Sequence, residues 1–235
     1  MSAAVRPAPP FARAPQALLL VFALALLAFY PSYLSRLPQT DAVRHFHGAV
    51  AFAWMLLLVA QATLARRRLF QWHRPLGRLV YLVAPLFLVS GALILHDLAG
   101  FSNPFQQAFG ARLVFVDLLA MAFYATAVWQ AVRHKRDVQV HARWMISTAL
   151  VLLPPAFARL VGMSGLVGSF EAAFHVAFFV TDAILLWLLR RDARAGRGAA
   201  AYRVLLGVTV LAQLGFVVVP HVPAWTAACR AFGAL

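Results

Sequence analysis

Histidine and carboxylate side chains recur near the ends of long apolar segments, where they could bind a metal ion or a haem. Imidazole nitrogens and carboxylate oxygens suit zinc, copper and iron, and histidines are common axial ligands of haem iron. The only cysteine is Cys229, which excludes an internal disulfide and an iron–sulfur cluster held by several cysteines. Any bound metal would therefore depend on nitrogen and oxygen ligands.

Two pairs of histidines are candidate axial ligands of a haem. His47 and His175 form an outer pair, and His73 and His141 form an inner pair near the opposite membrane face. Axial ligation of this kind sets the electronic properties of the iron, and the surroundings tune its reduction potential. The sequence thus predicts haem as a possible cofactor.

The outer side carries further ionisable residues that allow other sites. A catalytic zinc or other transition-metal site would use three protein ligands and an open position, and these ligands could be His47, His175 and either Asp117 or Glu171. Arg112 and Arg159 could neutralise haem propionates or an anionic substrate. The same groups could instead form a buried salt-bridge network, or a proton or substrate pathway. No H-E-x-x-H motif is present to favour a metal site.

The composition of the chain is that of a membrane protein. Of its 235 residues, 63% are hydrophobic and 12% are charged, and the mean hydropathy is +0.79. Soluble domains are nearer half apolar and a quarter charged. The net charge of +14 comes from short basic clusters between apolar segments, which is typical of topology selection and of contact with anionic lipid headgroups. We therefore expect a lipid bilayer around the chain and no nucleic-acid partner.

Seven segments approach or exceed the roughly 20 apolar residues that a spanning helix needs. They are Gln16 to Leu34, His45 to Ala65, Leu79 to Leu98, Phe105 to Val132, Trp144 to Met163, Phe170 to Leu189 and Tyr202 to Pro220. The pattern predicts an all-α fold, with residues 1–235 forming a single domain of about seven transmembrane helices. Pro154 and Pro155 should bend the fifth of them.

The distribution of lysine and arginine predicts the orientation. Sixteen of the 21 basic residues lie on one side: before the first segment, in the loops after the second, fourth and sixth segments, or, for Arg203, at the start of the seventh segment. The positive-inside rule places that side in the cytoplasm. We therefore expect a multi-pass protein of the bacterial inner membrane, with a cytoplasmic N-terminus and a C-terminus outside.

Helical spacing predicts which polar residues point into the bundle. His47, Trp54 and Gln61 are seven residues apart in turn and share one helix face. Glu171, His175 and Asp182 share a face of the sixth segment in the same way. Both stripes are expected to face inward, because ionisable groups are costly in contact with lipid.

Two motifs in the basic loops resemble those of an uncharacterised family of bacterial predicted membrane proteins, which have a domain of unknown function. His73–Arg78 has the pattern HRxxGR, and His141–Ile146 has the pattern HxRWMI. The resemblance covers roughly residues 44–159 and implies topology and motif placement, but no reaction. The paired histidines are also distantly similar to those of di-haem cytochrome b membrane proteins, although the ligand order along the chain differs.

Haem binding and electron transfer, with a redox partner or a quinone, is the function that we favour from the sequence. One alternative is a proton-coupled transporter or channel that uses Asp117, Glu171, His175 and Asp182. Another is a metal-dependent membrane hydrolase built on the outer histidines. The inner histidines could also be structural or contact lipid phosphates, since arginines flank both of them. Substrate, enzymatic activity and oligomeric state stay undetermined.

Overall fold

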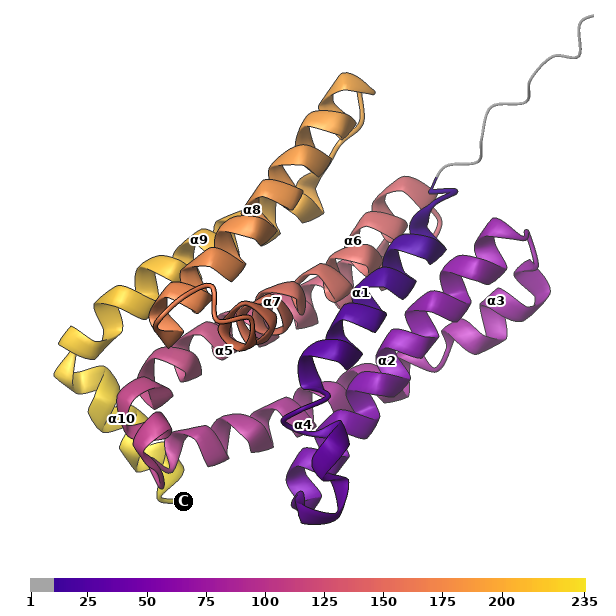
Figure 1. Ribbon diagram of the computed structural model, residues 1–235. Coiled ribbons are helices and arrows are strands. Elements are labelled where there is room, and N and C mark those ends of the chain that lie inside the picture. The colour runs from indigo at the N-terminus through magenta and orange to yellow at the C-terminus, as the bar shows by residue number, and fades with distance from the viewer. Residues whose placement is uncertain (1–10) are drawn as a thin grey trace, which may run out of the picture.

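The computed structural model describes residues 11–235 as a bundle of helices with short connections (Figure 1). The longer helices are α1 (Ala14–Phe29), α2 (Ala42–Arg66), α4 (Val80–Ala99), α5 (Pro104–Arg133), α6 (Val138–Leu150), α7 (Leu153–Met163), α8 (Phe170–Arg194) and α9 (Ala200–Val218). The shorter ones are α3 (Phe70–Gly77), α10 (Pro223–Gly233) and the 3-10 helices η1 (Leu34–Gln39) and η2 (Val219–His221). The predicted all-α fold is confirmed.

Six helical segments in the described part of the chain have the length and hydropathy of membrane spans. They are Ala42–Arg66, Val80–Ala99, Pro104–Arg133, Val138–Met163, Phe170–Arg194 and Ala200–His221. They correspond to the second to seventh predicted segments. The first predicted segment forms α1, which is apolar but has only 16 residues. At 1.5 Å per residue α1 is about 24 Å long, shorter than the roughly 30 Å hydrocarbon layer.

The fifth predicted span is interrupted near its middle. α6 ends at Leu150, and α7 begins at Leu153, so that Pro154 and Pro155 lie in the first turn of α7. Proline lacks the N–H that would continue the helix, and its ring collides with the preceding turn. The predicted bend is therefore confirmed, and it lies at residues 151–152.

Four helices begin at a side chain that accepts hydrogen bonds from the backbone of the first turn. These capping residues are Asp41 for α2, Asn103 for α5, Asp137 for α6 and Ser169 for α8. Such caps satisfy N–H groups that have no partner within the helix. Because Asp137 fixes the start of α6, it also fixes the position of His141 in the first turn.

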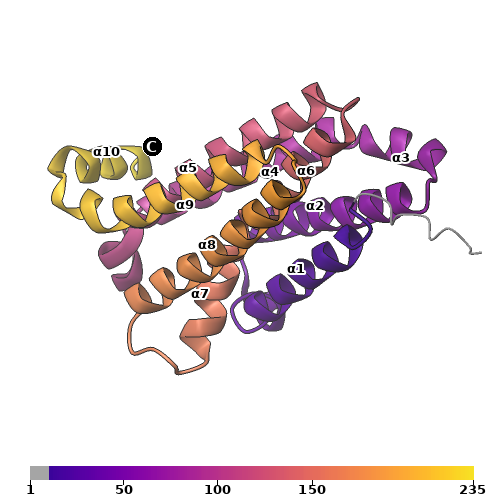
Figure 2. The ribbon, with the colours of Figure 1, turned by 90° about the horizontal axis from the view of Figure 1, so that it is seen from above.

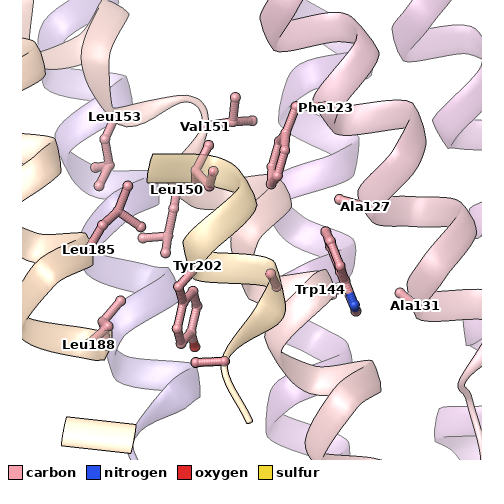
Figure 3. Close-up of a cluster of buried hydrophobic side chains, with 13 residues drawn as sticks. Phe123, Ala127, Ala131, Trp144, Leu150, Val151, Leu153, Leu185, Leu188 and Tyr202 are labelled. Atoms are coloured by element: carbon pink, nitrogen blue, oxygen red, sulfur yellow. The ribbon is translucent and has the colours of Figure 1, made fainter. Parts of the chain in front are cut away.

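The largest buried cluster joins α5, α6, α8 and α9 (Figure 3). Phe123 and Trp144 pack there with Leu185 and Tyr202, and the exposed fraction of each side chain is 6% or less. Burial of large apolar side chains and close packing hold the helices together. A second cluster joins α1, α2 and α4 around Trp54.

Many apolar side chains on the perimeter point away from the bundle. Leu20, Phe179 and Leu214 expose 60%, 62% and 59% of their surface. They come from α1, α8 and α9, so the apolar perimeter extends over several helices. Surfaces of this kind are covered by lipid in a bilayer. The chain is therefore an integral, multi-pass membrane protein in contact with the bilayer.

The connections carrying the basic clusters share one end of the bundle, which we call the basic end. It holds α3, the α5–α6 turn and the α8–α9 turn, whereas α10 lies at the opposite end (Figures 1 and 2). The basic residues in these connections are Arg66, Arg67, Arg68, Arg74, Arg78, Lys135, Arg136 and Arg197. α3, which runs between two spans, was not expected from the sequence, which placed the His73–Arg78 motif in a basic loop.

Candidate functional site

A cavity of about 1090 Å³ lies at the basic end, and we call it the basic-end cavity. Residues of α1, α2, α3, α4 and α6 line it, together with residues at the end of α5. Most of its wall is apolar, as with Leu18, Leu57, Val80 and Met145. Ligand sites in proteins commonly combine such an apolar wall with a few polar groups.

His73 lines this cavity from α3. Its Nδ1 lies 3.1 Å from the backbone carbonyl oxygen of Gln61 on α2. A carbonyl oxygen only accepts, so Nδ1 donates, and in the neutral ring Nε2 keeps a free lone pair. Desolvation by burial lowers the pKa of His73, because it disfavours the charged ring. The neutral ring is therefore favoured.

His141 lines the same cavity from the first turn of α6 and has the same arrangement. Its Nδ1 donates to the backbone carbonyl oxygen of Ala131 on α5 across 2.9 Å. Burial has the largest effect on the pKa of His73, the hydrogen bond to Gln61 opposes it, and the nearby charges of His141 and Arg74 lower the pKa further. The structure thus brings the two predicted inner histidines to one cavity, each with its Nε2 free of the backbone contact.

Gln61 supplies a further polar group to the wall. Its side chain is only 9% exposed, and its Nε2 is buried without a hydrogen-bond partner among residues 11–235. A buried amide that lacks a partner costs roughly 1–3 kcal/mol. The sequence placed Gln61 on the inward stripe of α2, and the structure confirms that it is buried, but spacing alone did not identify it as part of a site.

The rim of the cavity is strongly basic. Six of its lining residues are cationic: Arg66, Arg68, Arg74, Arg78, Lys135 and Arg136. No lining residue is acidic, and none of the six forms an ion pair with a carboxylate within residues 11–235. The cavity therefore combines an apolar interior with an opening that attracts anionic groups.

His47 of the predicted outer pair contacts α4 at the opposite end. Its Nδ1 lies 3.1 Å from Ser90 Oγ, and its ring lies 5.4 Å from the Phe87 ring between centroids. Ser90 Oγ donates its own proton to the carbonyl oxygen of Phe87 at 2.9 Å. The serine oxygen therefore accepts from Nδ1, and this contact ties α2 to α4.

His175 has aromatic surroundings on α8 and α9. Its ring lies 5.3 Å from Phe174, 5.7 Å from Phe216 and 6.3 Å from Phe179 between centroids. Because His47 faces α4 and His175 packs on α9, the structure does not give the predicted outer pair a common pocket.

The other predicted outer residues are also distributed among separate contacts. Arg112 lies 3.9 Å from Glu171 and rests over the Phe216 ring, while Arg159 lies over the Phe29 ring and donates to the Pro155 carbonyl. In the part of the chain that the structure describes, no three His, Cys, Asp or Glu residues are grouped to hold a metal ion. The four predicted metal ligands are His47, His175, Asp117 and Glu171, and they are not gathered.

Asp182 uses both of its carboxylate oxygens to join α8 and α9. Oδ1 accepts from Thr209 Oγ1 at 2.6 Å, and Oδ2 accepts from Gln213 Nε2 at 2.8 Å. A carboxylate satisfied in this way stabilises the contact between the two helices. Its partners lie on α9, so Asp182 is separated from the contacts of Glu171.

A buried ion pair at the basic end was missed by the sequence analysis. Arg143 Nε donates to Asp192 Oδ2 at 2.6 Å, and the two side chains are 3% and 1% exposed. The sequence suggested only an orientation signal for Arg143. Asp192 could have been noticed because it is the one acid within a run of arginines at the end of α8.

The fold and the apolar spans define the class of the molecule as an α-helical, multi-pass integral membrane protein. No protein-family model, no curated protein and no solved structure matches the chain. The resemblance to the uncharacterised family therefore rests on the two motifs in the basic loops alone.

Proposed function

We propose that the protein binds one b-type haem in the basic-end cavity, with Nε2 of His73 and Nε2 of His141 as the axial ligands. The observation that carries the proposal is that both imidazoles donate from Nδ1 to a backbone carbonyl and line the same cavity. Ligating histidines almost always donate their other ring nitrogen in this manner, which fixes the tautomer and orients the ring.

The rest of the cavity suits the two chemical parts of a haem. The macrocycle is apolar and matches walls such as Leu57, Val80 and Met145. The propionates are anionic and match the basic rim, where Arg74 and Arg78 are free of carboxylate partners in the described part of the chain. Arginine forms strong, often bidentate hydrogen bonds to carboxylates.

Electron transfer is the function that this arrangement would serve. A bound haem would supply one-electron redox chemistry. We infer from the positive-inside rule that the basic end faces the cytoplasm of a bacterial cell, that the C-terminus lies outside and that α1 completes seven spans. A soluble redox protein on that side, or a quinone in the bilayer, would then exchange the electron.

We limit the proposal to one haem, at the inner pair. The His47 ring packs against Phe87 of α4, and His175 is packed by three phenylalanine rings. Neither histidine lines the basic-end cavity. Arg112 and Arg159, which were predicted to neutralise propionates, also lie outside that cavity.

A visible spectrum of the detergent-purified full chain tests the proposal. We expect a Soret band that shifts on reduction with dithionite, and we expect His73→Ala and His141→Ala each to abolish the low-spin spectrum. His134→Ala is the matched control, because His134 Nδ1 also bonds a backbone carbonyl, that of Gln130 at 2.9 Å, but lies outside the cavity. A colourless protein after haem-supplemented expression would disprove haem binding.

A further inference from the structure

The side chain of Gln61 is positioned to recognise part of the molecule that occupies the basic-end cavity. It lines the cavity, it is 9% exposed, and its Nε2 is buried without a partner among residues 11–235. Among the residues that line the cavity, it is the one whose buried side-chain polar atom lacks a partner. Nearly all buried polar groups in proteins have a hydrogen-bond partner, so we expect this amide to have one when the cavity is occupied.

Gln213 shows what a buried glutamine does when the protein itself supplies the partner. It is 8% exposed, nearly the same as Gln61, yet its Nε2 donates to Asp182 Oδ2 at 2.8 Å and to the Thr209 carbonyl at 3.3 Å. No lining residue of the basic-end cavity offers Gln61 a carboxylate. The partner of Gln61 would therefore come from the occupant.

We propose that the Gln61 amide donates a hydrogen bond to a carboxylate of the occupant and thereby makes the cavity selective for an amphipathic acid. This inference rests on the proposed haem binding and identifies a propionate as the recognised group. The amide can turn about its last bond, because that torsion has a broad, twofold preference, and so it can present its N–H to the cavity.

The charge of the cavity favours an anionic acceptor over a neutral one. Six cations line the rim and no acid does, so an oxygen that enters this field is stabilised when it is negatively charged. A hydrogen bond to an ionised acceptor is about twice as strong as one between neutral groups. The recognised oxygen is thus a carboxylate oxygen rather than a neutral carbonyl.

Gln61 would make two contacts, one through its backbone and one through its side chain. Its backbone carbonyl accepts from His73 Nδ1, while its side chain contacts the occupant. The position of the carboxylate is therefore coupled to the axial histidine through one residue of α2. Gly77 of α3 lies beside this amide, since a Cβ placed there would be 3.7 Å from Gln61 Oε1.

A comparison of two porphyrins tests the inference. Haem and its dimethyl ester share the macrocycle and the iron, but only haem carries free carboxylates. Full-length protein from haem-depleted cells would be titrated with each compound and followed by its Soret band. We expect Gln61→Leu to weaken binding of haem by about tenfold or more and to leave binding of the ester unchanged, because a hydrogen bond to a charged group contributes about that much.

Two further variants keep the test decisive. Gln61→Met retains the length of the side chain without a donor and should reproduce the selective loss if Gln61→Leu folds poorly. Gln213→Leu removes a buried amide elsewhere and should leave the ratio of the two affinities unchanged.

The possible outcomes separate this inference from the proposal beneath it. An equal loss for haem and for the ester, or no loss for either, would overturn the carboxylate contact while leaving haem binding in place. Failure of the wild-type protein to bind either porphyrin would overturn the haem site and the carboxylate contact together.

Discussion

At the basic end of the bundle, His73 and His141 are each oriented by a backbone carbonyl and line an apolar cavity with a cationic rim. At the opposite end, His47 is bonded to a serine on α4, and His175 is packed among phenylalanines. The residue type is the same, and both pairs lie near helix ends. What differs is the surroundings of the rings, which line a cavity at the basic end and pack against aromatic side chains at the opposite end.

The ion pairs of the two ends differ in how far they are exposed. The Arg143–Asp192 pair at the basic end is 3% and 1% exposed, whereas Arg44 and Asp97 at the opposite end are 47% and 42% exposed. Buried pairs are costly to break, and exposed pairs contribute little. The basic end thus contains a buried ion pair on α6, the helix that also carries His141.

Paired double variants should give the largest effect and test the contrast between the two histidine pairs. We expect His73→Ala/His141→Ala to lose haem completely on purification, because both axial ligands are gone. His47→Ala/His175→Ala should keep the wild-type haem content. The measurement is the ratio of Soret absorbance to protein. Loss of half the haem from the outer variant would instead indicate a second haem and support the di-haem arrangement.

Removal of one carboxylate at each end tests the contrast between the ion pairs. Asp192→Ala leaves the Arg143 guanidinium buried and uncompensated, and we expect it to lower the free energy of unfolding by about 3–5 kcal/mol. Asp97→Ala, in the exposed pair, should cost at most about 1 kcal/mol. Thermal unfolding in detergent measures both. Recovery of stability in Arg143→Met/Asp192→Leu would show that the loss comes from the unpaired charge, and equal losses at the two ends would contradict the comparison.

The sequence predicted the elements well because their signals are local. Length and hydropathy located six spans within a few residues of their observed bounds, and Pro154 and Pro155 marked the break between α6 and α7. It did not predict α3, since Phe70–Gly77 has only eight residues and contains Pro75, and so does not stand out from a loop. α1 is shorter than the predicted first segment because it ends at Phe29, and the 3-10 helix η1 begins at Leu34.

The site was less predictable because it depends on contacts between helices. Spacing placed His47 and Gln61 on one face of α2. It could not show that Ser90 of α4 bonds His47, or that Gln61 Nε2 lacks a partner in the described part of the chain. Similarly, the carbonyls that orient His73 and His141 belong to Gln61 and Ala131. The side chains of these two residues do not indicate that their backbone carbonyls accept from a histidine. The haem assignment itself stays a prediction.

Removing one helix-capping side chain at each end should have a smaller effect, and the two variants are matched. Asp137 caps α6 beside the cavity, and Asn103 caps α5 at the opposite end. Asp137→Ala and Asn103→Ala should each lower the free energy of unfolding by about 1 kcal/mol. Only Asp137→Ala should also weaken haem binding, because it loosens the turn that carries His141. Soret titration and thermal unfolding separate the two effects, and a weaker affinity in both variants would argue against a local cause.

The smallest expected effect is the pH dependence that His73 contributes. Burial lowers its pKa in the folded protein below the ordinary value of 6.5, whereas the unfolded chain keeps that value. As the pH falls through about 6.5, the unfolded state therefore binds more protons than the folded state, and the free energy of unfolding decreases. The variant His73→Gln tests this, because it removes the titrating group while retaining an amide that can donate to the Gln61 carbonyl. In thermal unfolding of haem-free protein between about pH 7.5 and 5.5, the stability of the variant should decline less steeply than that of the wild type. Because His73 is only half-buried, the difference should be smaller than the loss of a helix cap, and identical slopes would mean that its protonation is the same in both states.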